Sequence, residues 1–123
     1  MGLTYADVVV FSLDRKAEKK IHFLVDTGSL HSLLPGSMVN ELGLEEVGEV
    51  ELELADMQVI TKPYAFAIFQ YENDRLGAAN VVIGENNVEP LLGATALEAM
   101  NLSVDPTKNI LVKNRVAKMK YFY

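Results

Sequence analysis

Short β-strand patterns recur along nearly the whole chain, and they limit its possible folds more than any other feature. Glu49–Leu54 alternates strictly between glutamate and apolar residues, as a half-buried strand does. The other runs are rich in β-branched and aromatic residues and are separated by turn-forming residues. These further strand candidates are Val8–Phe11, Ile21–Val25, Val59–Phe69, Val81–Ile83 and Ile110–Val112. The sequence therefore predicts an all-β fold.

Two segments have helical patterns, and both are short. Pro35–Leu42 starts with a proline suited to a first turn and is followed by Gly43, a typical helix stop. Ala94–Met100 has apolar residues on one side, and Asn101 after it can adopt the left-handed conformation that ends a helix. With 123 residues, half of them hydrophobic, the chain fits a single domain over residues 1–123 with its own core.

The composition excludes several classes of function. The chain has no cysteine, which rules out thiolate zinc sites, iron–sulfur clusters, cysteine nucleophiles and disulfides. With 11 basic against 17 acidic residues, it is a poor candidate for binding nucleic acid. The N-terminus lacks the layout of a signal peptide, and the apolar runs are too short to span a membrane. We therefore expect a soluble cytoplasmic protein.

The strongest chemical signal is an apolar strand that ends in Asp26, Thr27, Gly28 and Ser29. One interpretation is an ordinary β-turn, in which the acid and hydroxyl cap backbone donors and Gly28 supplies a positive φ. The other is a carboxylate that changes its protonation state during catalysis. One carboxylate cannot be both acid and base, and the chain has no second Asp-Thr-Gly. A catalytic partner for Asp26 would therefore come from another copy of the chain.

The order of motifs resembles the retropepsin-like (retroviral-type) aspartic peptidases, especially their stand-alone prokaryotic members. The resemblance covers roughly Leu3–Val112 and rests on Asp26–Ser29, on Leu34–Gly36, and on Leu91–Gly93, which begins 65 positions after Asp26 and opens the last helix. Asn101–Pro106 after that helix also fits the family. The resemblance implies a closed-barrel-like, all-β domain with two short helices that works as a homodimer.

The same resemblance implies an aspartic endopeptidase that hydrolyses internal bonds of an extended peptide. Asp26 from each of two subunits would hold and activate a water molecule, without metal or other cofactor. Thr27 would bond the partner's turn across the two-fold axis, Gly28 would supply amide donors, and Ser29 would bond the outer carboxylate oxygen. The residues implied to support Asp26 are Thr27, Gly28, Ser29, Leu91, Leu92 and Gly93.

The family also covers its cleft with a hairpin flap, for which Leu52–Ile60 is the candidate here. Its turn comprises Ala55, Asp56, Met57 and Gln58. Relatives commonly have glycine after the aspartate, so Met57 makes a tight turn with positive φ less accessible. We expect a flap that is stiffer, differently shaped or capped by Met57 touching substrate, with an ordinary hairpin and an exposed Met57 as the alternative.

Other functions and sites are weaker interpretations. His22 and His31 lack the spacing of a zinc site, and no nucleophile elbow supports a serine triad. A catalytically inactive peptide-binding or dimerisation module on the same fold is the main alternative. A phosphate-binding turn at Gly28 would lack the lysine of a P-loop. We expect the glutamates of Glu49–Glu53 to be solvated, and the basic Lys113–Tyr123 to be a solvated strand, a frayed end or a subunit contact.

Overall fold

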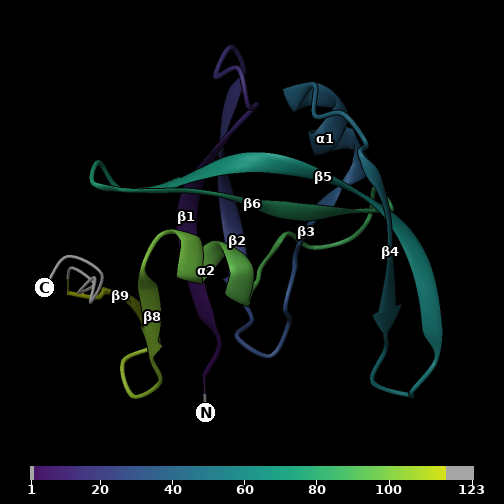
Figure 1. Ribbon diagram of the computed structural model, residues 1–123. Coiled ribbons are helices and arrows are strands. Elements are labelled where there is room, and N and C mark those ends of the chain that lie inside the picture. The colour runs from purple at the N-terminus through teal and green to yellow at the C-terminus, as the bar shows by residue number, and fades with distance from the viewer. Residues whose placement is uncertain (1, 116–123) are drawn as a thin grey trace, which may run out of the picture.

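The computed structural model describes residues 2–115 of the chain (Figure 1). Within them the backbone forms two helices, α1 (Gly36–Leu42) and α2 (Ala94–Ala99), and nine strands. The strands are β1 (Thr4–Phe11), β2 (Glu18–Val25), β3 (Ser32–Pro35), β4 (Gly48–Glu53), β5 (Val59–Tyr71), β6 (Arg75–Gly84), β7 (Leu91–Leu92), β8 (Leu102–Asp105) and β9 (Ile110–Lys113).

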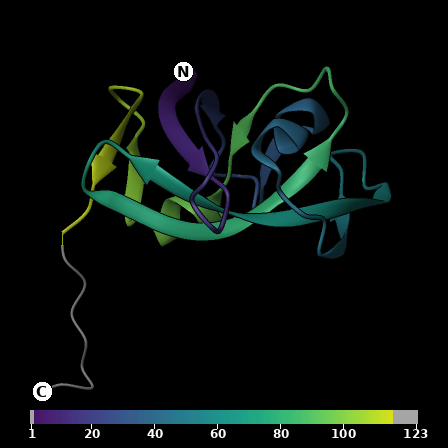
Figure 2. The same cartoon turned by 90° about the horizontal axis from the view of Figure 1, so that it is seen from above.

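Six strands pair into a closed ring. Their order is β1-β2-β7-β3-β6-β5, and β5 pairs again with β1, with Val10 opposite Phe69. β4 extends β5 outside the ring, and β8 and β9 form a separate two-stranded sheet. Seen from above, β5 and β6 sweep across the width of the molecule as long curved strands (Figure 2). The expected closed-barrel-like, all-β fold with two short helices is confirmed.

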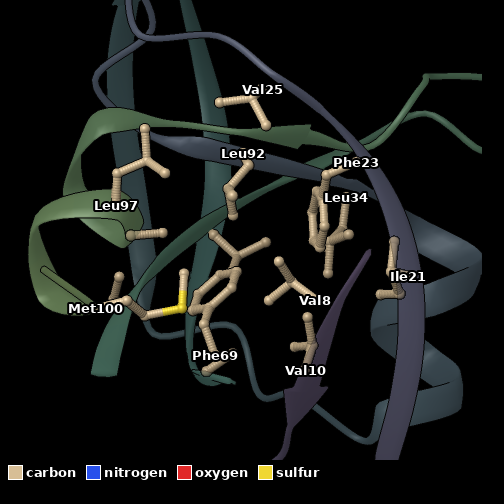
Figure 3. Close-up of a cluster of buried hydrophobic side chains, with 14 of the residues drawn as sticks. Val8, Val10, Ile21, Phe23, Val25, Leu34, Phe69, Leu92, Leu97 and Met100 are labelled. Carbon is tan, nitrogen blue, oxygen red and sulfur yellow. The ribbon is translucent and has the colours of Figure 1, made fainter. Parts of the chain in front are cut away.

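Alternating side chains of the strands fill this ring with a hydrophobic core. Val8 and Val10 of β1 are buried together because residues two apart on a strand share a face. The rings of Phe23 in β2 and Phe69 in β5 lie 6.2 Å apart at the centre of the cluster (Figure 3). Met100, just after α2, packs on the same cluster. Each such side chain contributes roughly 1.5–3 kcal/mol by leaving water, and the core therefore holds the ends of the strands rigidly.

The first helix ends at Leu42 as predicted, and the second ends at Ala99, one residue before the predicted Met100; a residue with positive φ follows each. Gly43 adopts φ 64° after α1, and Asn101 adopts φ 56° shortly after α2. The start of the first helix differs from the prediction by one residue, since Pro35 is extended (φ −61°, ψ 145°) and belongs to β3. Proline lacks only an N–H donor, so it can end a strand as readily as it begins a helix.

Three strand features were not predicted. β3 and β8 were not expected as strands, and β6 spans ten residues where only Val81–Ile83 was expected. The first half of β6 contains Gly77 and neighbouring alanines, which have low strand propensity. A Cβ at Gly77 would lie 2.4 Å from the carbonyl oxygen of Ala99, so the close packing of α2 requires glycine there. Tertiary packing outweighs local propensity in this strand.

The β4–β5 hairpin corresponds to the candidate flap. Met57 N–H donates to the Leu54 carbonyl at 2.9 Å, and Leu54 N–H donates to the Gln58 carbonyl at 2.8 Å. The Asp56 carboxylate accepts the Gln58 N–H at 3.1 Å. Met57 adopts φ 70°, so the tight turn forms with a non-glycine residue in the left-handed region. Three hydrogen bonds thus stabilise the turn in which Met57 adopts the positive φ that a glycine would adopt more easily.

The basic residues near the C-terminus fall partly outside the described structure. Lys113 ends β9, and its Nζ lies 2.8 Å from Asp74 Oδ1 and also contacts Glu72, so it is ion-paired rather than only solvated. Lys118, Lys120 and the segment Tyr121–Tyr123 lie outside the described residues, and the expectations for them stay predictions.

Candidate active site

Asp26 lies at the end of β2, where the backbone is fixed by β7. The two strands run parallel, with Leu24 opposite Leu91 and Val25 opposite Leu92. The Asp26 N–H donates to the Leu92 carbonyl at 2.9 Å. Phe23 and Leu92 are fully buried, so the core holds both strands up to this point. The position of Asp26 is therefore set by the barrel rather than by a free loop.

The carboxyl group of Asp26 is held in one orientation by its own turn. Gly28 N–H donates to Oδ1 at 3.0 Å, and the Ser29 hydroxyl donates to Oδ2 at 2.9 Å. The expected bond from Ser29 to the carboxylate is therefore present. Asp26 is half-buried and Thr27 is exposed in the single chain. A bond from Thr27 across a two-fold axis stays a prediction.

Gly28 does not act as the simple turn interpretation expects. The glycine with positive φ in the described chain is Gly43, so Gly28 has no left-handed conformation. A Cβ at Gly28 would lie 3.3 Å from Oδ1 of Asp26, which is a tight contact. Glycine at this position leaves room for its own backbone amide to approach the Asp26 carboxylate closely.

The first turn of α2 anchors the segment after Ser29. Ala94 N–H donates to the Ser29 carbonyl at 2.8 Å, and Thr95 N–H donates to the Leu30 carbonyl at 3.0 Å. The fully buried Ser32 accepts the N–H of Gly93 on its hydroxyl at 3.0 Å. The Leu91–Gly93 motif and the Asp26–Ser29 motif thus form one bonded unit.

Leu91, Leu92 and Gly93 have different surroundings within this unit. Leu92 is buried in the core, whereas the half-buried Leu91 lines a cleft beside the Asp26 turn. A Cβ at Gly93 would lie 2.4 Å from the carbonyl oxygen of His31, so only glycine fits between α2 and the loop. Gly93 permits the close contact on which the geometry of the loop depends.

A cleft of about 460 Å³ separates the Asp26 turn from the β4–β5 hairpin. Both lie at the same end of the molecule (Figure 1). The cleft is partly apolar, and Asp26 itself is not among its lining residues in the single chain. The lining residues are Gly28, Ser29, Leu30, His31, Ser32, Leu33, Glu51, Leu52, Glu53, Leu54, Val82 and Leu91.

The hairpin contributes to this cleft through β4 rather than through its tip. Leu52 of β4 and Leu54, directly after β4, line the cleft, whereas the turn residues Ala55, Asp56, Met57 and Gln58 do not. The Met57 residue is 77% exposed, as in the alternative of an ordinary hairpin. The glutamates of β4 are exposed as expected, and Glu51 and Glu53 also line the cleft.

An ion pair at the base of the hairpin ties it to the barrel. Lys62 of β5 donates to Glu85, after β6, at 2.7 Å. This hydrogen bond and the lysine charge lower the pKa of the Glu85 carboxyl below its ordinary value.

The two histidines have different surroundings. His22 lies on the outer face of β2, where its ring stacks on Tyr5 and its Nδ1 lies 2.8 Å from Asp7 Oδ1. His31 lines the cleft, and its Nδ1 lies 2.6 Å from Asn80 Nδ2. Residues 2–115 contain no group of three or more histidines and carboxylates placed to hold a metal ion.

The network of His31, Asn80 and Thr95 was missed by sequence reasoning. Thr95 Oγ1 donates to Asn80 Oδ1 at 3.1 Å, which links α2 to β6. The three residues are far apart in the sequence, and no motif joins them, so their contact follows only from the packing of α2 on β6.

No helix in the described part of the chain is long and apolar enough to cross a membrane.

The sequence and the structure were compared with those of known proteins. No curated protein matches the sequence. A solved structure described as a retropepsin-like aspartic protease from Rickettsia conorii is 19% identical, with a TM-score of 0.47, covering 85% of this chain and 86% of that one. Residues 15–99, which include both motifs of the site, match the family described as "gag-polyprotein putative aspartyl protease". The chain belongs to this family of retropepsin-like aspartic proteases.

Proposed function

We propose that the protein is an aspartic endopeptidase whose active site forms between two copies of the chain. Its family consists of aspartic proteases, which places it with peptidases in general. The arrangement of the Asp26 carboxyl group is the observation that supports a catalytic role for this residue. The carboxyl group is half-buried at the end of a rigid strand and bonded through both oxygens by Gly28 and Ser29.

The second carboxyl group would come from Asp26 of another subunit. Asp26 is not part of the cleft wall of one chain, and Thr27 beside it is exposed. A symmetric dimer that brings two such turns together would complete the cleft. Two close carboxyl groups do not ionise together easily, so the pair would share one proton.

This pair has the groups needed for peptide hydrolysis by water. The ionised carboxylate takes a proton from a bound water, whose oxygen attacks the carbonyl carbon of the substrate. The protonated carboxyl group gives its proton to the carbonyl oxygen. When the resulting gem-diol collapses, the carbon–nitrogen bond breaks and the leaving nitrogen takes the proton that the first carboxylate accepted from water. One hydroxyl of the gem-diol returns its proton to the second carboxylate, which leaves a carboxylic acid product. One water molecule is consumed for each peptide bond, and the two carboxyl groups return to their starting state.

An extended peptide is the substrate that the cleft favours. β4 is an edge strand, so its free backbone groups can pair with a peptide strand. Leu30, Leu33, Leu52 and Leu54 in the cleft wall provide apolar contacts. We expect cleavage next to hydrophobic side chains.

The test is a peptide-library digest with the wild type and two variants at acid to neutral pH. Asp26→Asn should abolish cleavage and keep the fold. Asp14→Asn, a change of the same chemistry in the β1–β2 turn, should keep cleavage. Full cleavage by Asp26→Asn would refute the proposal.

A mixing experiment tests whether two chains share one site. Equal amounts of wild type and Asp26→Asn, allowed to exchange subunits, should retain about one quarter of the wild-type activity per dimer, since only that share has two aspartates. A chain that works alone would retain about half. Loss of activity on dilution, followed with light scattering, gives an independent measure of the dimer.

A further inference from the structure

The His31 side chain lines the cleft and is tied into a polar network that reaches behind the cleft wall. Its Nδ1 lies 2.6 Å from Asn80 Nδ2 on β6, and Asn80 Oδ1 accepts the hydroxyl of Thr95 on α2 at 3.1 Å. All three residues are half-buried. The ring is therefore attached to two elements of the barrel.

The backbone of His31 is fixed as firmly as its ring. The carbonyl groups of Ser29 and Leu30 accept the first N–H groups of α2, and the His31 carbonyl packs against Gly93. A side chain fixed at both ends loses little further freedom when it binds a ligand, which favours a selective contact.

The network decides which nitrogen of the neutral ring carries the proton. The amide nitrogen of Asn80 faces His31, and the amide oxygen accepts the Thr95 hydroxyl. An amide nitrogen can only donate, so with this orientation of the Asn80 amide Nδ1 of His31 has to accept. The proton of neutral His31 therefore lies on Nε2, which is left as a free donor at the cleft.

The charges around the cleft favour a neutral rather than an acidic acceptor for this donor. Glu51 and Glu53 line the same cleft from β4. Their negative charges repel an acidic side chain of a substrate, whereas a neutral amide oxygen meets no such repulsion. Glutamine and asparagine offer this oxygen.

We infer that His31 is a specificity-determining residue, which donates from Nε2 to a glutamine or asparagine side chain of the substrate. Asn80 and Thr95 are positioning residues that act through His31. The inference rests on the proposed function, because it names a substrate feature of the same cleft. Each subunit of a dimer supplies one His31, so the preference occurs at two positions placed symmetrically about the cleaved bond.

The experiment compares matched peptides that carry glutamine or methionine, which are similar in length, at each position in turn. The wild type should cleave the glutamine peptides with the higher kcat/KM at the two symmetric positions, mainly through a lower KM. His31→Leu should lower this ratio about ten-fold, the usual worth of one such hydrogen bond. His22→Leu, the matched change outside the cleft, should leave the ratio unchanged.

Two further measurements keep the test valid if His31→Leu does not fold. Thr95→Val retains His31 and should lower the preference partly, because Asn80 is no longer oriented. Long-range ¹H–¹⁵N spectra of the Asp26→Asn protein show directly whether neutral His31 is protonated on Nε2. A ring protonated on Nδ1, or a glutamine preference that survives in His31→Leu, would overturn the inference.

The outcomes separate this inference from the proposed function. Cleavage by the wild type without a glutamine or asparagine preference overturns the role of His31 and leaves the peptidase intact. If no peptide is cleaved, the peptidase fails, and affinities of the Asp26→Asn protein for the same peptide pairs decide the role of His31. Equal affinities, or no binding, would then overturn it as well.

Discussion

Replacing Gly93 with alanine tests how the fold holds the candidate site. A Cβ on Gly93 would lie 2.4 Å from the carbonyl oxygen of His31 and 2.9 Å from that of Ser29. Real Cβ contacts stay above 3.0 Å, so the loop or α2 must move by at least the difference of 0.6 Å (3.0 − 2.4). Both opposing groups are backbone, and neither can rotate away.

The expected cost follows from this displacement. Overpacking of a closely packed site typically costs about 1–3 kcal/mol of the free energy of unfolding. The shift also strains the bonds from Ala94 and Thr95 to the loop that carries Ser29. Because a displacement on the order of 1 Å can lower catalysis about 100-fold, we expect cleavage by Gly93→Ala to fall far more than its folded fraction.

Gly77→Ala is the matched control. Its Cβ would lie 2.4 Å from the carbonyl oxygen of Ala99, at the other end of α2 and away from the cleft. Urea unfolding should show similar destabilisation of both variants, while cleavage and amide exchange of Ala94 and Thr95 should change chiefly in Gly93→Ala. Equal losses of activity per folded molecule in the two variants, or none in Gly93→Ala, would refute the reasoning.

Three further changes test other parts of the structure. Ser32→Ala leaves the buried N–H of Gly93 unpaired and should lower the free energy of unfolding by about 1–3 kcal/mol in urea titration; an unchanged midpoint would contradict this. Met57→Gly relieves the φ of 70° and should raise that free energy by up to about 1 kcal/mol, whereas a lower midpoint would show that no strain was present. Lys113 lowers the pKa of Asp74, so the stabilisation by this pair is present above pH 3.8 and is lost as the pH falls through the lowered value. The difference in Tm between wild type and Asp74→Asn should therefore vanish at low pH, and a constant difference would count against the ion pair.

The fold was predictable where local patterns agree with tertiary packing. The alternation in Glu49–Leu54 and the apolar run Ile21–Val25 lie in β4 and β2 within a few residues of the expected bounds. The long β6 was not predictable, because its first half is built from small residues that fit against α2. Its strand conformation comes from pairing with β5, which no local pattern encodes.

The candidate site, like the fold, was predictable only where its contacts are local in the sequence. The bond from Ser29 to Asp26 is local, three residues apart, and was implied by the family resemblance of the motif. The anchoring of the loop by Ala94 and Thr95 joins residues more than 60 positions apart, and only the docking of α2 creates it. The sequence therefore indicated which residues are candidates for the chemistry and gave little about what holds them in place.

Glycine is the residue type that indicates this long-range packing in the sequence. Gly77 and Gly93 stand at the two sites where the backbone of α2 meets another backbone too closely for any side chain. Neither has a positive φ, so neither is explained by turn geometry. A glycine inside a strand or before a helix, with no turn to require it, is thus a usable signal of close backbone packing. In this chain it indicates the contacts that hold the Asp26 loop on the barrel, and the pair of alanine substitutions measures how much of the site depends on them.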